Sequence, residues 1–139
     1  MNGQKEFEKI MEKAERIALA SAVDNTPNVR IVNFVFEASK KVLYFVSTKG
    51  DPKEAEFLKN SNVAFTTIPT KGLAHIRVHY ATVTKSKKSV FDAADMFIAK
   101  MPWYKENIEQ NGNEMNLYEV HFTTATVLVG PDKALSVEL

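Results

Sequence analysis

Five residues of this chain could bind an anion together if the fold brings them to one place: Arg30, Asn33, Ser47, Thr48 and Lys53. The first two lie in one predicted strand, the next two end the following strand, and the lysine follows a glycine turn. An arginine can bind a phosphate group through two parallel hydrogen bonds, and a lysine adds a point charge. Because a hairpin between the two strands would gather these side chains, the pattern indicates a site for a phosphorylated ligand.

The same residues also have an ordinary structural explanation. Arg30 would then be a surface residue of a strand, and Lys53 a first-turn helix lysine without a partner. The helix dipole disfavours a cation at a helix N-terminus, so a lysine there is unusual unless an anion lies beside it. The spacing alone leaves both interpretations open.

The stretch "VSTKGDPKEAEFLKN", residues 46–60, predicts the end of a strand, a turn and a helix over residues 52–59. The unpaired amides that begin a helix can bind an anion. Here, however, Asp51 stands at the expected N-cap, with Pro52 at the first helical position and Glu54 three residues after the cap. We therefore expect Asp51 to serve the helix and to weaken the binding of a phosphate.

No metal site is expected. His75 and His79 would share a metal if they lay on a helix, but their surroundings predict a strand, where they would be about 13 Å apart. His121 offers no local partner for a metal shared with the other two histidines. The absence of cysteine excludes disulfides, thiolate catalysis and cysteine-ligated zinc.

Two further classes of function have weak support. The segment "RVHYATVTKSKK", residues 77–88, mixes aromatic and basic residues, as a single-strand nucleic-acid platform does. Its lysines are nevertheless expected in a solvated turn, and the net charge is only +1. No serine has the context of a nucleophile elbow, and "KGDPK" lacks the glycines and the Gly-Lys-Ser/Thr ending of a P-loop. We therefore expect neither nucleic-acid binding nor serine catalysis.

The composition places the chain among globular proteins. Its 139 residues are 45% hydrophobic and 25% charged, which fits one domain over residues 1–139. The longest apolar run falls far short of the roughly 20 residues that cross a bilayer. The polar, amphipathic opening does not have the pattern of a signal peptide, so we expect a cytoplasmic location and no membrane partner.

Alternating and β-branched patterns predict strands over residues 17–23, 29–37, 42–48, 62–68, 74–85 and 116–130, with a short apolar tail after them. Helical spacing appears near residues 7–14, at 52–59 and at 89–101, where Ser89 is the expected cap and Pro102 the stop. Residues 103–115 are expected to form a loop or a short helix. With only one short helix between strands, the pattern favours an antiparallel barrel or a strongly bent sheet with peripheral helices.

The order of these elements resembles the FMN-binding split-barrel family of pyridoxamine 5′-phosphate oxidase-like proteins. The resemblance lies in the small-residue strand "IALASAV", the arginine-led strand "RIVNFVF", the hairpin "LYFVSTKGDPKEAEFLKN", and the strands "NVAFTT" and "HIRVHYATVT". It implies a mainly β fold, a six- to seven-stranded antiparallel split β-barrel with peripheral helices. It also implies a homodimer with two FMN molecules at the interface.

The resemblance further implies a role for particular residues. Arg30 matches the arginine that binds the FMN phosphate, and Lys53 matches a second phosphate ligand. The other matches lie along the flavin ring and ribityl chain, and comprise Ile31, Val32, Asn33, Val46, Ser47, Thr48 and His75. We expect Arg30 and Lys53 to hold the phosphate, with Ser47 or Thr48 assisting.

Some positions depart from the family pattern. Asp51 and Pro52 stand where many members have a serine, and Val35 stands where true oxidases have a lysine. The Arg- and Trp-bearing segment that closes the substrate site of true pyridoxamine phosphate oxidases has no counterpart after Val129. Oxidation of vitamin B6 is therefore not expected, although we still expect a site that binds flavin.

The resemblance implies a small flavin-dependent oxidoreductase, in which the cofactor transfers a hydride and the barrel positions it. The alternative is a non-catalytic module on the same fold that binds flavin or haem. A haem iron would need an axial histidine, which His75, His79 or His121 could supply. Trp103 and Tyr104 could stack on a bound ring or cover the end of the barrel.

Overall fold

The computed structural model describes residues 2–139 and contains nine antiparallel strands with four α-helices; Met1 of the predicted domain lies outside the described residues. The strands are β1 (Arg16–Val23), β2 (Thr26–Asn33), β3 (Val35–Glu37), β4 (Val42–Thr48), β5 (Asn62–Thr67), β6 (His75–Lys85), β7 (Met115–His121), β8 (Thr124–Gly130) and β9 (Lys133–Glu138). The helices are α1 (Gly3–Lys13), α2 (Pro52–Lys59), α3 (Ala94–Lys100) and α4 (Tyr104–Asn111), and a 3₁₀ turn, η1, covers Gly112–Glu114. The predicted mainly β fold class is confirmed.

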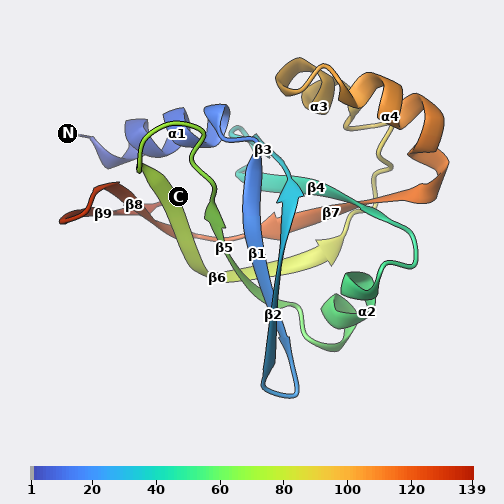
Figure 1. The fold of residues 1–139 in the computed structure, drawn as a ribbon, viewed down its shortest axis with the longest axis horizontal. Coiled ribbons are helices and arrows are strands. Elements are labelled where there is room, and N and C mark those ends of the chain that lie inside the picture. The colour runs from blue at the N-terminus through green and yellow to red at the C-terminus, as the bar shows by residue number, and fades with distance from the viewer. Residues whose placement is uncertain (1) are drawn as a thin grey trace.

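The strands form one sheet that curls on itself. Neighbouring strands follow the order β2-β1-β5-β6-β7-β4-β3, with β8 beside β6 and β9 beside β8. The two ends of this order, β2 and β3, are consecutive in the chain, so the sheet bends until its ends approach each other, as in a split barrel. Figure 1 shows α1 lying across one end of the sheet and α3 with α4 at another, while α2 lies apart from the other helices, with its backbone nearest to β1.

Two predicted strands are each broken in two, which raises the strand count above the expected six or seven. Residues 29–37 divide at Phe34, because β2 pairs with β1 whereas β3 pairs with β4. Residues 116–130 divide at Phe122 and Thr123, because β7 pairs with β4 whereas β8 pairs with β9. An alternating pattern does not reveal such a change of partner. The apolar tail adds the ninth strand.

Phenylalanine and aliphatic side chains fill the barrel, and α1 closes it with Phe7 and Met11, each only 1% exposed. A second apolar cluster lies between α3, α4 and the outer face of β4 and β7, and includes Tyr44, Phe97 and Tyr104. No helix within residues 2–139 is long and apolar enough to cross a membrane.

The helix predicted over residues 89–101 begins later, at Ala94. The backbone N–H of Ser89 donates to Asp92 Oδ2 at 2.8 Å, and the N–H of Asp92 donates to Ser89 Oγ at 3.4 Å. This reciprocal pair closes a turn before the helix instead of capping the helix itself. Residues 103–115 contain α4, a helix of two turns, followed by η1.

The short helix α2 is attached to the barrel by Phe57, its only buried residue. The Phe57 ring lies 6.0 Å from the ring of Phe45 and 5.6 Å from that of Tyr118, between ring centroids. This contact fixes the rotation of α2 about its axis. As a result, Lys53 and Glu56 face the hairpin of β1 and β2.

Candidate functional site

Arg30 and Lys53, the two predicted phosphate ligands, line one shallow cavity of about 310 Å³ between β2 and the start of α2. The complete lining is Asn28, Arg30, Ile31, Val32, Asp51, Pro52, Lys53 and Glu56. Residues more than twenty positions apart in the sequence are thus brought together, as the sequence analysis expects.

The guanidinium of Arg30 is held in place by three acceptors. Its Nη1 donates to the carbonyl oxygen of Leu19 at 3.2 Å and to Ser21 Oγ at 2.9 Å. Its Nη2 donates to Glu56 Oε1 at 3.0 Å, which makes a salt bridge. The Arg30 Cζ also lies 5.7 Å from the centroid of the Phe57 ring. These contacts fix the orientation of the Arg30 guanidinium, and only 18% of the side chain is exposed.

The ammonium group of Lys53 has an anionic partner at the N-terminus of α2, and that partner is the carboxylate of Asp51 instead of a bound ligand. Its Nζ lies 3.2 Å from Asp51 Oδ1, the same oxygen that accepts a hydrogen bond from the Lys53 backbone N–H at 3.1 Å. These contacts, the backbone hydrogen bond most of all, hold the pKa of Asp51 below its usual value. The predicted N-cap is confirmed, and the lysine opposed to the helix dipole is explained by Asp51.

Glu54, the other acidic residue in the first turn, does not complete a capping box. Its Oε1 accepts a hydrogen bond from the backbone N–H of Gly50 at 3.0 Å, and its Oε2 accepts one from Asn116 Nδ2 at 2.9 Å. Glu54 therefore fixes the glycine turn against β7. Gly50 itself has φ = +84°, a backbone conformation that favours glycine.

Glu56 is a site residue that the sequence analysis missed, because acidic residues of an amphipathic helix usually face solvent. Its carboxylate accepts hydrogen bonds from Ser21 Oγ at 2.7 Å and Asn28 Nδ2 at 3.2 Å, in addition to the bond from Arg30. The Ser21 bond, with these others, keeps the pKa of Glu56 below its usual value. Helical spacing puts Glu56 three residues after Lys53, on the same face of α2, which is the signal that could have found it.

The donor set of the cavity fits a phosphate group. The hydrogen bonds formed within residues 2–139 use three of the five N–H donors of Arg30, which leaves Nε–H and one hydrogen of Nη2 for an added anion. The Lys53 ammonium has three donors, and one carboxylate oxygen lies beside it. Asp51 and Glu56 balance the two cations, so an incoming phosphate would compete with carboxylates already in place.

Five of the predicted site residues do not line this cavity: Asn33, Val46, Ser47, Thr48 and His75. Ser47 is buried and donates to the carbonyl oxygen of Thr48 at 3.3 Å, and it pairs with Asn116 of β7. The Asn33 side-chain amide donates to the carbonyl oxygen of Glu15 at 3.3 Å. The expected hairpin between these residues is shorter than predicted, because β3, not β2, pairs with β4.

Ile31 and Val32 line the cavity with Arg30, whereas Val46 and Thr48 do not. His75 lies at the start of β6, where its Nδ1 is 2.7 Å from the carbonyl oxygen of Leu73. It belongs to another cavity, of about 520 Å³, between β5, β6 and β8. Within one chain, therefore, the structure joins Arg30 and Lys53 but leaves His75 apart from them.

Comparison with protein families identifies the chain. The family model described as pyridoxamine 5′-phosphate oxidase-like matches residues 10–132. The chain belongs to this family. No curated protein has a sequence significantly similar to it.

Solved structures of distant relatives have the same pyridoxamine 5′-phosphate oxidase-like fold. A NimC/NimA family protein from Clostridium acetobutylicum is 19% identical, with a TM-score of 0.68 over 99% of this chain and 95% of its own. General Stress Protein 26 from Bacillus anthracis is 14% identical, with a TM-score of 0.70 over the full length of both chains. A haem-binding protein from Mycobacterium smegmatis is 8% identical, with a TM-score of 0.79 over 99% of this chain and 58% of its own.

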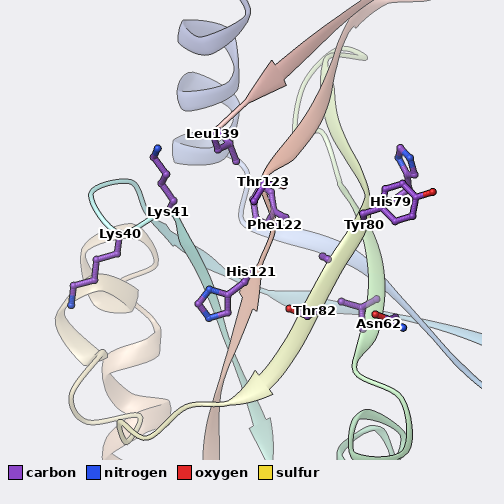
Figure 2. Close-up of a pocket in the computed structure, with 12 residues that line it drawn as sticks. Lys40, Lys41, Asn62, His79, Tyr80, Thr82, His121, Phe122, Thr123 and Leu139 are labelled. Atoms are coloured by element: carbon purple, nitrogen blue, oxygen red, sulfur yellow. The ribbon is translucent and has the colours of Figure 1, made fainter.

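In this pyridoxamine 5′-phosphate oxidase-like chain, a further cavity lies away from Arg30. It measures about 790 Å³ and is lined by residues from β5, β6, the end of β7 and the turn at Lys40 and Lys41. Two histidines border it, but Figure 2 shows that His79 and His121 extend to opposite sides of β6. His121 Nε2 lies 2.9 Å from Glu119 Oε1, and the His79 ring lies 4.4 Å from the Tyr80 ring. The two imidazoles therefore do not converge.

No group of three or more His, Asp or Glu side chains in residues 2–139 could hold a metal ion. Trp103 is half exposed and stacks on buried Tyr104, with 4.2 Å between their ring centroids. Tyr104 in turn packs against Phe97 of α3. Through these contacts Tyr104 joins the second apolar cluster and Trp103 covers it from outside, which differs from the predicted cover of the barrel end.

Proposed function

We propose that the protein is an FMN-binding flavoprotein and a small flavin-dependent oxidoreductase that acts on a small-molecule substrate. The observation that carries this proposal is the convergence of Arg30 and Lys53 on one cavity, with donors of both side chains left for a phosphate. Charge-assisted bonds from an arginine fork and a lysine are strong and suit a phosphate monoester. Membership of the pyridoxamine 5′-phosphate oxidase-like family supports the same cofactor.

In this proposal the chain binds and orients the cofactor, and the flavin, when bound, supplies hydride transfer. Arg30 and Lys53 hold the phosphate, and Glu56 with Ser21 holds the guanidinium in a fixed direction. Ile31 and Val32 follow Arg30 in β2, and in this proposal their backbone runs beside the flavin ring. Asn33, Val46, Ser47, Thr48 and His75 complete the proposed ring and ribityl contacts.

A homodimer with the cofactor at the interface is part of the proposal. β2 is an end strand of the sheet, and Val29 and Ile31 on it are 63% and 59% exposed. Two large apolar side chains on an open strand, next to the cavity, favour a second copy of the chain as the partner. We propose further that the single domain works in the cytoplasm without a nucleic-acid or membrane partner.

An absorption spectrum of the purified protein after soaking in excess FMN and gel filtration tests the proposal. We expect the two visible absorption bands of an oxidised flavin to elute with the protein, in an amount close to one flavin per chain. A protein that remains colourless after this treatment would contradict FMN binding. The alternative, a haem-binding module, is favoured by the structural similarity to a haem-binding protein and would produce a Soret band after soaking in haemin.

Replacing Asp51 with asparagine is expected to tighten FMN binding several-fold. Asparagine is as good an N-cap as aspartate, so the hydrogen bond to the Lys53 N–H is kept while the carboxylate that competes with phosphate is removed. Fluorescence titration with FMN measures the affinity, and thermal unfolding without FMN measures the cap. The matched control is Glu54→Gln, which also removes one negative charge from the first turn but lies outside the cavity lining. Equal affinity in the Asp51 variant and the wild type would show that Asp51 does not compete.

A further inference from the structure

Lys100, in the last turn of α3, reaches between two other elements. Its Nζ donates to the carbonyl oxygen of Met11 at 3.1 Å and to that of Phe34 at 3.2 Å, and lies 3.9 Å from the centroid of the Phe34 ring. Met11 is in the last turn of α1, where carbonyls lack helical partners, and Phe34 lies at the break between β2 and β3. Two neutral acceptors thus hold the amine at a fixed point.

Burial of this amine raises the fraction of its neutral form above that of an exposed lysine. Among residues 2–139 no carboxylate forms a salt bridge with Nζ within 4.0 Å, and Glu15 and Glu12 stabilise the ammonium only by Coulombic attraction at longer range. Burial outweighs them and lowers the pKa of Lys100 to about 8. A neutral amine has two N–H donors, enough for both carbonyls, and keeps a free lone pair.

Lys100 also lines a cavity of about 490 Å³, which shares no residue with the cavity of Arg30. Its wall combines the apolar side chains of Met11, Val35, Phe36 and Met96 with the charged side chains of Glu12, Lys13 and Glu15. A positioned amine on an apolar wall is the arrangement in which lysines become nucleophiles. A small molecule in this cavity would lie against the side chain of Lys100.

We propose that Lys100 is a carbonyl-reactive lysine that takes up a small aldehyde with an apolar substituent as an imine. The Nζ lone pair attacks the aldehyde carbon to form a carbinolamine, and loss of one water molecule then leaves the C=N bond. The two amine hydrogens and the aldehyde oxygen leave as that water, so no oxidant or reductant is needed. Protonation of the imine nitrogen restores one N–H, which can donate to one of the two carbonyls.

The test uses the full chain without flavin, because the reaction requires neither cofactor nor partner. The protein is treated briefly at pH 7 with limiting propanal and sodium cyanoborohydride, which reduces an imine to a stable propyl-lysine. Peptide mapping by mass spectrometry then compares Lys100 with Lys13, an exposed lysine on the rim of the same cavity. At this pH the lowered pKa gives Lys100 a neutral fraction more than roughly a hundredfold above that of an ordinary lysine. A less basic amine is also a weaker nucleophile, which offsets part of the gain in neutral fraction. We therefore expect Lys100 to be labelled at least about tenfold faster than Lys13.

The pH profile separates a nucleophile from a structural lysine. Labelling of Lys100 should level off above about pH 8, whereas labelling of Lys13 should keep rising. Ala99→Leu narrows the same cavity and should slow the labelling of Lys100 without changing that of Lys13. Lys100→Arg keeps a donor for both carbonyls, and in that variant the fast-labelled site should disappear. If Lys100 of the wild-type protein is labelled at the rate of Lys13 or more slowly, that result alone overturns the proposal. Lys100 would then have only the structural role of donating to the carbonyl at the end of α1 and to that of Phe34.

Discussion

Replacing Arg30 with alanine is expected to weaken FMN binding by more than tenfold, at least about 1.4 kcal/mol. The substitution removes the two free N–H donors proposed for the phosphate. It also leaves the Glu56 carboxylate in the cavity without its cation, bonded only to Ser21 and Asn28. A phosphate would then meet an unbalanced negative charge, so the loss should exceed that of an ordinary hydrogen bond. Titration of the apoprotein with FMN, followed by flavin fluorescence, measures the change.

Two variants separate charge from geometry at this position. Arg30→Lys keeps the charge but not the planar fork, and should bind FMN more weakly than the wild type and more tightly than the alanine variant. Arg30→Ala combined with Glu56→Gln removes both charges of the salt bridge and should recover part of the affinity lost in Arg30→Ala. A recovery of this kind is the interaction term of a double-mutant cycle.

Lys53→Ala is expected to weaken FMN binding by a similar factor, more than about tenfold. Its effect on the apoprotein should be smaller than its effect on the ligand, because the salt bridge of Lys53 is with Asp51 and that carboxylate remains the N-cap. Arg30→Ala, in contrast, should also lower the stability of the apoprotein, since Arg30 links β1, β2 and α2. Unchanged FMN affinity in both variants would place the phosphate elsewhere.

Much of the fold follows from local patterns that the sequence displays. The period-two alternation of residues 17–23 and the apolar run of residues 42–48 both predict strands that the structure contains. The breaks at Phe34 and Phe122 could not be predicted in this way. At both points the side chain stays buried while the backbone changes its pairing partner, so the hydrophobic pattern is not interrupted.

The candidate site was predictable where its residues obey a local rule. Asp51 and Pro52 have the spacing of a helix start, and the unusual cation at Lys53 pointed to a nearby anion. The role of Glu56 depends on tertiary contacts with Ser21 and Arg30, which sequence spacing does not contain. Likewise, the placement of Ser47 away from the cavity depends on which part of residues 29–37 pairs with β4.

The cavity exists only as long as α2 stays attached to the barrel, since α2 supplies Lys53 and Glu56 while β2 supplies Arg30. Substitution of Phe57 with alanine is therefore expected to act on stability and on binding together. Phe57 is 5% exposed and packs against Phe45 and Tyr118, so truncation should cost about 3–5 kcal/mol of the free energy of unfolding. Urea denaturation of the apoprotein measures this loss.

The neighbouring residue provides a matched control for that substitution. Leu58 is 90% exposed on the same helix, so Leu58→Ala should change the free energy of unfolding by less than about 0.5 kcal/mol. At temperatures where the Phe57→Ala variant is still folded, its FMN affinity should fall as well, because a loosened α2 no longer holds Lys53 opposite Arg30. A Phe57→Ala variant that unfolds at lower urea but binds FMN as tightly as the wild type would show that α2 does not position the phosphate ligands. Equal losses of stability in the two variants would contradict the assignment of Phe57 as the anchor of α2.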